Sequence, residues 1–155
     1  CGRSNEGRRS MKDSTAKWLA FAEENLGCAR LVVEREYYNA ALQNAQQAVE
    51  KALKALVIER DIGFSKTHSI QQLRNMVADE GLGDLLADEE CELLDSIYLP
   101  SKYPLGSALP ASEPDADICS KCTQIAETVL QNVHRLLDER PQDESAKPDL
   151  ATEEP

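Results

Sequence analysis

Apolar side chains recur every three or four positions along most of the chain, and this spacing predicts amphipathic helices. It predicts helices over about residues 14–36, 40–60, 67–81, 88–98 and 115–139. The second is the strongest, since one face carries Leu42, Ala45, Val49, Ala52, Leu53 and Leu56. No alternating strand pattern competes with these helices. We therefore expect an all-α protein: an antiparallel up-and-down helical bundle of four main helices plus a short extra helix.

Local signals place several of the helix ends. The apolar stripe of the first helix begins at Trp18, and Asp13 or Ser14 stands where a capping side chain is needed. Asn39 is a reasonable cap for the second helix, and Asp115 for the last. Because these side chains accept hydrogen bonds from the first backbone N–H groups of a helix, we expect them to fix where the helices begin.

Composition divides the chain into a bundle and two flanking segments. Residues 1–12 are assigned to a disordered arm or an expression-derived segment, because residues 1–10 show no hydrophobic pattern. The bundle is expected over 13–140. Within it, residues 99–114 hold four of the seven prolines and are expected to form a loop. Residues 141–155 are expected to be a disordered acidic tail.

The charge of the chain limits its partners. A net charge of −11 should on balance repel phosphate, so a broad nucleic-acid groove is disfavoured. The segment 51–74 is closer to neutral, with Lys51, Lys54, Arg60, Lys66 and Arg74 against two acidic residues. A local site for a small phosphate-bearing molecule is therefore compatible with the sequence.

Cysteine usage and hydropathy point to the cytoplasm. No apolar run approaches the roughly 18 residues of a membrane span, and no signal peptide is visible. Five cysteines with irregular spacing do not suggest a disulfide framework. Cys119 and Cys122 could suggest a metal or redox pair, but zinc sites need further ligands and both positions fall at or near the core face of a helix. We expect no metal, no cofactor and no membrane association.

Two stretches carry a resemblance to a known family. The first is YYNAALQNAQQAVEKALKAL at 37–56, followed by HSIQQL at 68–73; the second is LLDSIY at 93–98, followed by SKYP at 101–104. In this order they resemble the HEPN family (higher eukaryotes and prokaryotes nucleotide-binding). The shared features are a tyrosine corner, an AxxxxEKxxKA second helix, an HxxxxL third helix and an RYP segment. The resemblance covers about residues 14–138, so the bundle is expected to be HEPN-like.

The resemblance implies a function. Such proteins commonly form two-fold homodimers, and many accompany a small nucleotidyltransferase, sometimes as a toxin–antitoxin pair. Other members are metal-independent ribonucleases that place an Arg and a His four to six residues apart on one helix. Here Arg60 and His68 have seven residues between them with Gly63 in the interval, and no arginine lies in that window before His134. We therefore assign no catalytic residue and do not expect an enzyme.

The resemblance also implies a candidate ligand site. The positions carried over are Tyr38, Glu50, Lys51, Lys54, His68, Tyr98, Lys102 and Tyr103. Tyrosines can stack on a base, and lysines can meet phosphate as point charges. Lys102 stands where the family usually has the arginine of RYP, which loses the bidentate fork.

Structural roles for these residues stay open. Lys51 and Lys54 could cover a helix flank, and Glu50 could simply pair with Lys54 at i,i+4. Tyr98 and Tyr103 could anchor the proline-rich loop.

Three functions follow in order of preference. The first is a non-catalytic nucleotide- or substrate-binding accessory partner of a small nucleotidyltransferase, in a toxin–antitoxin pair. The second is a scaffold homodimer without a ligand. The third is an unconventional metal-independent ribonuclease that uses His68 with Arg60 or Arg74.

Overall fold

The computed structural model describes residues 10–63, 66–102 and 113–139, and within them it contains helices and no strand. The helices are α1 (Asp13–Glu34), α2 (Tyr38–Glu59), α3 (Ile70–Asp79), α4 (Asp88–Lys102) and α5 (Ala116–Asp138). The all-α prediction is confirmed, with α3 as the short extra helix. No described helix is long and apolar enough to cross a membrane.

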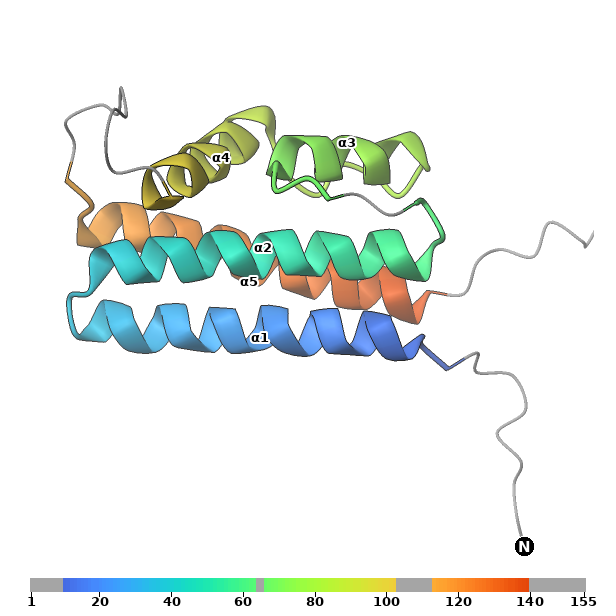
Figure 1. Ribbon diagram of the computed structural model, residues 1–155, viewed down its shortest axis with the longest axis horizontal. Helices are drawn as coiled ribbons and strands as arrows, with labels where there is room; N and C mark the ends of the chain where they lie inside the picture. The colour runs from blue at the N-terminus through green and yellow to red at the C-terminus, as the bar shows by residue number, and fades with distance from the viewer. Residues whose placement is uncertain (1–9, 64–65, 103–112, 140–155) are drawn as a thin grey trace, which may run out of the picture.

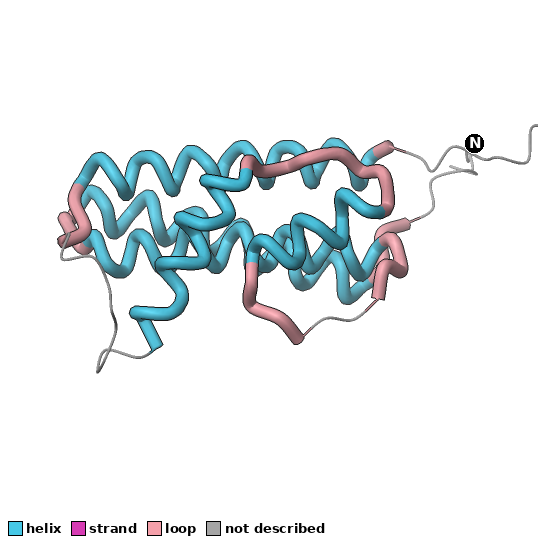
Figure 2. Tube along the Cα trace, turned by 90° about the horizontal axis from the view of Figure 1, so that it is seen from above, coloured by secondary structure: helices cyan, strands magenta, loops and turns pink. Residues whose placement is uncertain are grey.

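Helix α2 is the centre of the fold. It contacts all four other helices: α1 and α5 run beside it along its length, while α3 and α4 lie across its remaining side (Figure 1). Figure 2 gives the same arrangement from above. The alanines of α2 allow this close approach, because a small side chain lets neighbouring backbones come near. More of the circumference of α2 is therefore buried than the single predicted face.

The core lies where α2 meets its neighbours. Leu53 and Leu56 of α2, Leu73 of α3, Leu94 of α4 and Val133 of α5 are all fully buried. Each comes from a stripe with helical spacing, and burying such a side chain contributes about 1.5–3 kcal/mol. The core accordingly ties the short helices α3 and α4 to the long ones.

The start of α1 differs from prediction. Neither Asp13 nor Ser14 caps it: the N-cap is Lys12, which makes no side-chain cap hydrogen bond. Instead, the Lys12 backbone N–H and the Thr15 hydroxyl both donate to one carboxylate oxygen of Glu59, at 3.1 and 2.6 Å. A tertiary contact with the end of α2 thus replaces the local cap, which the local pattern could not reveal.

The predicted cap of the second helix is also wrong. Helix α2 begins at Tyr38, before Asn39, and its N-cap Tyr37 makes no side-chain cap hydrogen bond. The backbone turn after α1 closes there instead, with the Tyr37 N–H donating to the Val32 carbonyl oxygen at 3.0 Å. Asp115, by contrast, caps α5 as predicted, accepting from the Ile118 N–H at 2.9 Å.

The third helix begins later than predicted, at Ile70 rather than at residue 67 or 68. Asp95 of α4 explains the start: its carboxylate accepts from the Ile70 N–H at 2.6 Å and the Gln71 N–H at 3.3 Å. It also accepts from the Ser69 hydroxyl at 3.0 Å. The first N–H groups of a helix need acceptors. Asp95 supplies two of them from another helix, and the N-cap Ser69 adds a local one, since its hydroxyl oxygen accepts from the Gln72 N–H at 3.3 Å. His68 consequently lies in the connection before α3.

The fourth helix ends later than predicted. It continues through Pro100 to Lys102, so the expected loop over 99–114 is wrong for its first residues. A proline removes one backbone hydrogen bond and usually ends a helix. Only two residues follow it here, so the loss falls in the last turn. The tail at 141–155, most of the arm at 1–12 and most of the loop lie outside the described residues.

Candidate functional site

The Glu50 carboxylate is the most deeply buried charge of the described residues, with 3% of the residue exposed. Its Oε1 accepts a hydrogen bond from Lys54 Nζ at 3.0 Å and lies 2.6 Å from His68 Nδ1. Its Oε2 accepts from the Gln47 side-chain amide at 3.3 Å. A buried carboxylate is costly unless it is paired and hydrogen-bonded. The cluster is therefore a fixed arrangement rather than a chance surface pairing.

Two elements position this cluster. Glu50 and Lys54 stand one turn apart on α2, a spacing that places their side chains on one face. His68 approaches from the connection between α2 and α3, and the next residue, Ser69, is held by Asp95. The clamp on the start of α3 thus fixes the backbone beside His68, and with it the direction from which the imidazole meets Glu50.

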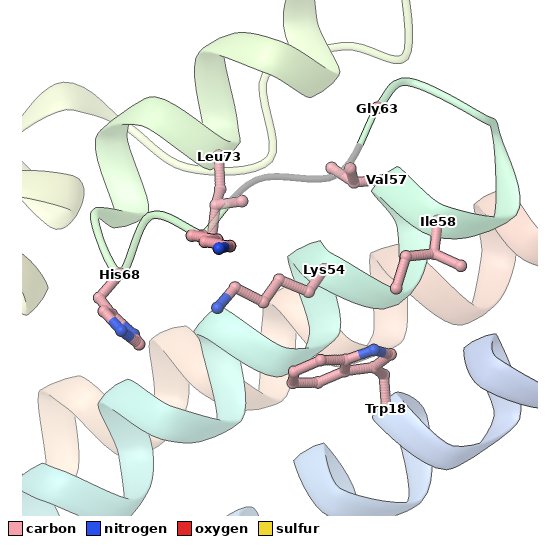
Figure 3. A pocket seen from close by; sticks show the side chains of 8 residues that line it. Trp18, Lys54, Val57, Ile58, Gly63, His68 and Leu73 are labelled. Carbon is pink, nitrogen blue, oxygen red and sulfur yellow. The ribbon is translucent and has the colours of Figure 1, made fainter.

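A pocket of about 320 Å³ opens beside the cluster. It is lined by Trp18, Lys54, Val57, Ile58, Gly63, Lys66, His68 and Leu73. Figure 3 shows Lys54 between His68 and Ile58, with the Trp18 ring reaching in from α1. The Lys54 ammonium lies 5.5 Å from the centroid of that ring, within the range of a cation–π contact. The pocket thus combines apolar walls with basic side chains.

The predicted site residues only partly come together. Glu50, Lys54 and His68 form the cluster. Lys51 faces α1 instead: its Nζ donates to Asn25 Oδ1 at 2.7 Å. The role of these four predicted site residues in binding a ligand stays a prediction.

Tyr38 lies away from this cluster, at the first residue of α2, so about 18 Å of helix separates it from Glu50. Burial raises the pKa of its phenol, with the nearby charge of Glu36 adding to the effect. The side chains of Tyr98 and Lys102, and all of Tyr103, lie outside the described residues.

Several pocket residues were missed by sequence reasoning. Trp18 was predicted only to belong to the apolar stripe of the first helix, yet its half-buried ring forms a wall of the pocket. Lys66 was noted only for its positive charge in the segment 51–74, yet it also lines the pocket. Neither has a local signal that points to Glu50, because the pocket joins α1, α2 and the α2–α3 connection.

Comparison with known proteins decides the family. The HEPN domain profile matches residues 15–136, most of the chain. The chain belongs to the HEPN family. This membership confirms the resemblance carried by the second and third helices.

Related proteins are found at low sequence identity. The chain is 26% identical over 133 residues to the "Putative toxin MJ1304" of Methanocaldococcus jannaschii, a match covering 79% of this chain and 88% of that protein. Among solved structures, it resembles TT1696 from Thermus thermophilus with a TM-score of 0.67 and 28% identity, covering 81% and 99% of the two chains. It also resembles ST0689, an archaeal HEPN homologue, with a TM-score of 0.61 and 26% identity, covering 79% and 97%.

The arginines required by the ribonuclease alternative are engaged elsewhere in this HEPN chain. Arg60 donates from Nη2 to the Leu136 carbonyl oxygen at 2.6 Å, near the end of α5. Arg74 pairs with Asp88 at the start of α4. Within the described ranges, neither guanidinium is among the groups that contact His68 or line its pocket. The basic partner beside His68 and Glu50 is Lys54 instead.

The cysteines of α5, Cys119 and Cys122, are buried. Burial raises the pKa of Cys122 to about 11, and it also raises the pKa of Cys119. The Cys119 thiol donates to the Tyr38 carbonyl oxygen at 3.4 Å. Because the thiolate is the reactive and metal-binding form, both residues behave as small core side chains. No group of three or more potential metal ligands occurs among the described residues.

Proposed function

We propose that this HEPN protein is a non-catalytic, nucleotide-binding accessory partner of a small nucleotidyltransferase, within a toxin–antitoxin pair. The observation that carries the proposal is the Glu50–Lys54–His68 cluster beside the pocket walled by Trp18. A concave, mostly apolar pocket with a few convergent polar groups is the usual form of a small-molecule site. The proposal includes a cytoplasmic location, where nucleotides are available.

The chemistry of the pocket suits a nucleotide. Trp18 presents an aromatic surface to a planar base, and Val57 and Ile58 add apolar contact. Lys66 supplies a cation for a phosphate. The chain has a net charge of −11, so basic side chains at this pocket make it a more favourable place for an anionic ligand than the rest of the surface. These features favour an anionic aromatic ligand over a neutral one.

One observation supports an accessory rather than a catalytic role, and another supports the toxin–antitoxin pairing. Arg60 and Arg74 have their hydrogen-bond partners away from His68. Neither arginine is therefore positioned to act together with this histidine as the ribonuclease alternative requires. The likeness to a protein named as a putative toxin supports placement in a toxin–antitoxin pair. A toxin of this kind would be regulated by its partner, which the nucleotidyltransferase would provide.

Self-association belongs to the same proposal. Leu31 on α1 and Tyr37 shortly after it are 66% and 65% exposed. We propose that another copy of the chain covers the surface around these two side chains. A scaffold homodimer without ligand is the second candidate, because this surface would serve it equally well.

Thermal unfolding with nucleotides tests the ligand part. Millimolar monophosphates and triphosphates of adenosine, guanosine, cytidine and uridine are added separately to the purified protein, because a ligand that binds only the folded state raises its stability. We expect a nucleotide-selective rise in Tm that is lost in Trp18→Ala. Phe21→Ala is the matched control: Phe21 lies one turn further along α1 and has its own lysine, Lys51, 5.6 Å from its ring. No rise with any nucleotide, or a rise that survives Trp18→Ala, would contradict the proposed site.

Co-purification tests the partner part. The chain is expressed together with any small nucleotidyltransferase that is found encoded beside it, and the mixture is separated by size exclusion. We expect a stable complex that elutes ahead of either protein alone. Separate elution at micromolar concentration would leave the scaffold homodimer as the better account.

A further inference from the structure

We infer that the pocket selects a nucleoside monophosphate over the corresponding triphosphate. The inference rests on the proposed nucleotide site and names the charge of its ligand. It follows from which of the basic side chains at the pocket is already neutralised, from the net charge of the chain, and from the volume enclosed.

Lys54 brings little uncompensated charge to the pocket. Its Nζ lies 3.0 Å from Glu50 Oε1, and its side chain is 12% exposed. Its ammonium also lies against the Trp18 ring, at 5.5 Å from the centroid. A cation held by a buried carboxylate and an aromatic face is largely satisfied before a ligand arrives. Lys54 therefore shapes the wall rather than attracting several phosphates.

Lys66 is the remaining lysine of the pocket, and it is exposed. Within the part of the chain that the structure describes, no ion pair engages its ammonium. His68 already meets Glu50 through Nδ1. Among the described residues of the pocket, this one unneutralised cation can meet a single phosphate group, whose charge is about −1.5 to −2 near neutral pH.

The overall charge of the chain bears on the number of phosphates. A net charge of −11 opposes the approach of a triphosphate more than that of a monophosphate, because the triphosphate carries more negative charge.

The volume supports the same ligand. At about 320 Å³, the pocket lies near the lower end of the roughly 300–1,000 Å³ typical of small-molecule sites. A base and its sugar would occupy most of it, with the phosphate at the rim beside Lys66. A triphosphate chain would have to extend beyond the pocket.

Calorimetric titration of the full chain without divalent metal tests the inference. For each base, the nucleoside, monophosphate and triphosphate are compared. We expect the monophosphate to bind roughly fivefold more tightly than either, as one solvent-exposed charged contact would provide. Lys66→Ala should reduce monophosphate affinity to that of the nucleoside. Lys121→Ala, which changes an exposed lysine on α5, should leave it unaltered.

The outcomes separate this inference from the proposed function. Triphosphate binding equal to or tighter than monophosphate binding would overturn the inference and leave the nucleotide site standing. Preference for the monophosphate that persists in Lys66→Ala would overturn the assignment of Lys66. Failure of every nucleoside and nucleotide to bind would remove the proposed ligand site itself.

Discussion

The two histidines of this HEPN protein make nearly the same contact in two different settings. His68 Nδ1 lies 2.6 Å from Glu50 Oε1, and His134 Nε2 lies 2.7 Å from Glu23 Oε1. The imidazoles are similarly exposed, with side-chain values of 51% and 46%. The carboxylates differ sharply: 3% of the Glu50 side chain is exposed, against 56% for Glu23. The buried carboxylate therefore distinguishes the two pairs.

Burial of the carboxylate has consequences for its neighbours. An exposed ion pair contributes about 0–1 kcal/mol, because water solvates each partner nearly as well. Glu50 has little access to water and depends on Lys54, His68 and Gln47 for compensation. These side chains are thereby held in place beside the pocket. Glu23 imposes no such order on its surroundings.

The largest expected effect comes from removing the buried carboxylate. Glu50→Ala leaves Lys54 and His68 without their shared acceptor and opens a small cavity. We expect a loss of about 2–3 kcal/mol in the free energy of unfolding, less than the roughly 3–5 kcal/mol of a fully buried pair because His68 reaches water. Glu23→Ala should change it by less than about 0.5 kcal/mol. Urea unfolding of both variants measures the difference, and equal losses would break the comparison.

The clamp on α3 should have the next largest effect. Asp95→Ala removes the acceptor for the Ile70 and Gln71 N–H groups and should cost about 1–2 kcal/mol. Because it also frees the backbone beside His68, nucleotide affinity should fall. Asp115→Ala removes the cap of α5 and should cost about 1 kcal/mol without changing affinity. Denaturation and calorimetry on both variants check this; unchanged nucleotide affinity in Asp95→Ala would show that His68 does not depend on the clamp.

Substituting the histidines gives a smaller contrast. His68→Ala removes one hydrogen bond to a buried carboxylate and should cost about 1 kcal/mol. His134→Ala removes an exposed contact and should fall within about 0.5 kcal/mol of the unaltered protein. Thermal unfolding resolves the two. A larger loss of stability for His134→Ala would contradict the view that the pair of His68 with the buried Glu50 stabilises the fold more than the exposed pair does.

The smallest expected effect on stability concerns two cysteines that differ in burial, Cys28 and Cys122. Near neutral pH, the difference should appear in the reactivity of their thiols. The raised pKa of Cys122, about 11, keeps its thiol neutral at pH 8, whereas Cys28 is half-buried. Iodoacetamide should therefore modify Cys28 well before Cys122, as peptide mass mapping would show. Rapid modification of Cys122 in the folded protein would contradict its burial.

The same pKa shift gives stability a direction with pH. The folded-state pKa of Cys122 lies above its ordinary value of 9.0, so the folded chain holds the proton more tightly than the unfolded one. Its contribution is complete below about pH 9 and is lost as the pH rises toward 11. Cys122→Ala should flatten that part of the profile of unfolding free energy against pH.

The sequence predicted the helices well because their signal is local. Apolar spacing located every described helix, and the i,i+4 spacing of Glu50 and Lys54 is visible in the amino-acid sequence. The helix starts were harder to predict. Helix α1 depends on Glu59, and α3 depends on Asp95 in addition to its local cap Ser69. Glu59 and Asp95 both lie on other helices. A pattern read along the chain holds no information about such acceptors.

The candidate site was predictable only in part for the same reason. Family resemblance brought His68 together with Glu50, although the two are 18 positions apart. Trp18 could not be assigned to the pocket, since an apolar residue on a helical stripe reads as core. Its position at a pocket wall depends on how α1 packs against α2 near the α2–α3 connection.

Fluorescence of Trp18 is the most direct test of the central claim, that the pocket beside Glu50, Lys54 and His68 binds a nucleotide. Trp18 is the only tryptophan in the chain, so its emission reports on one wall of that pocket. Titration with nucleoside monophosphates, excited at the red edge of the indole band, should quench or shift the emission to saturation. The change should weaken in Glu50→Gln and persist in Glu23→Gln. Emission that stays constant while calorimetry reports binding would place the nucleotide elsewhere and contradict the account.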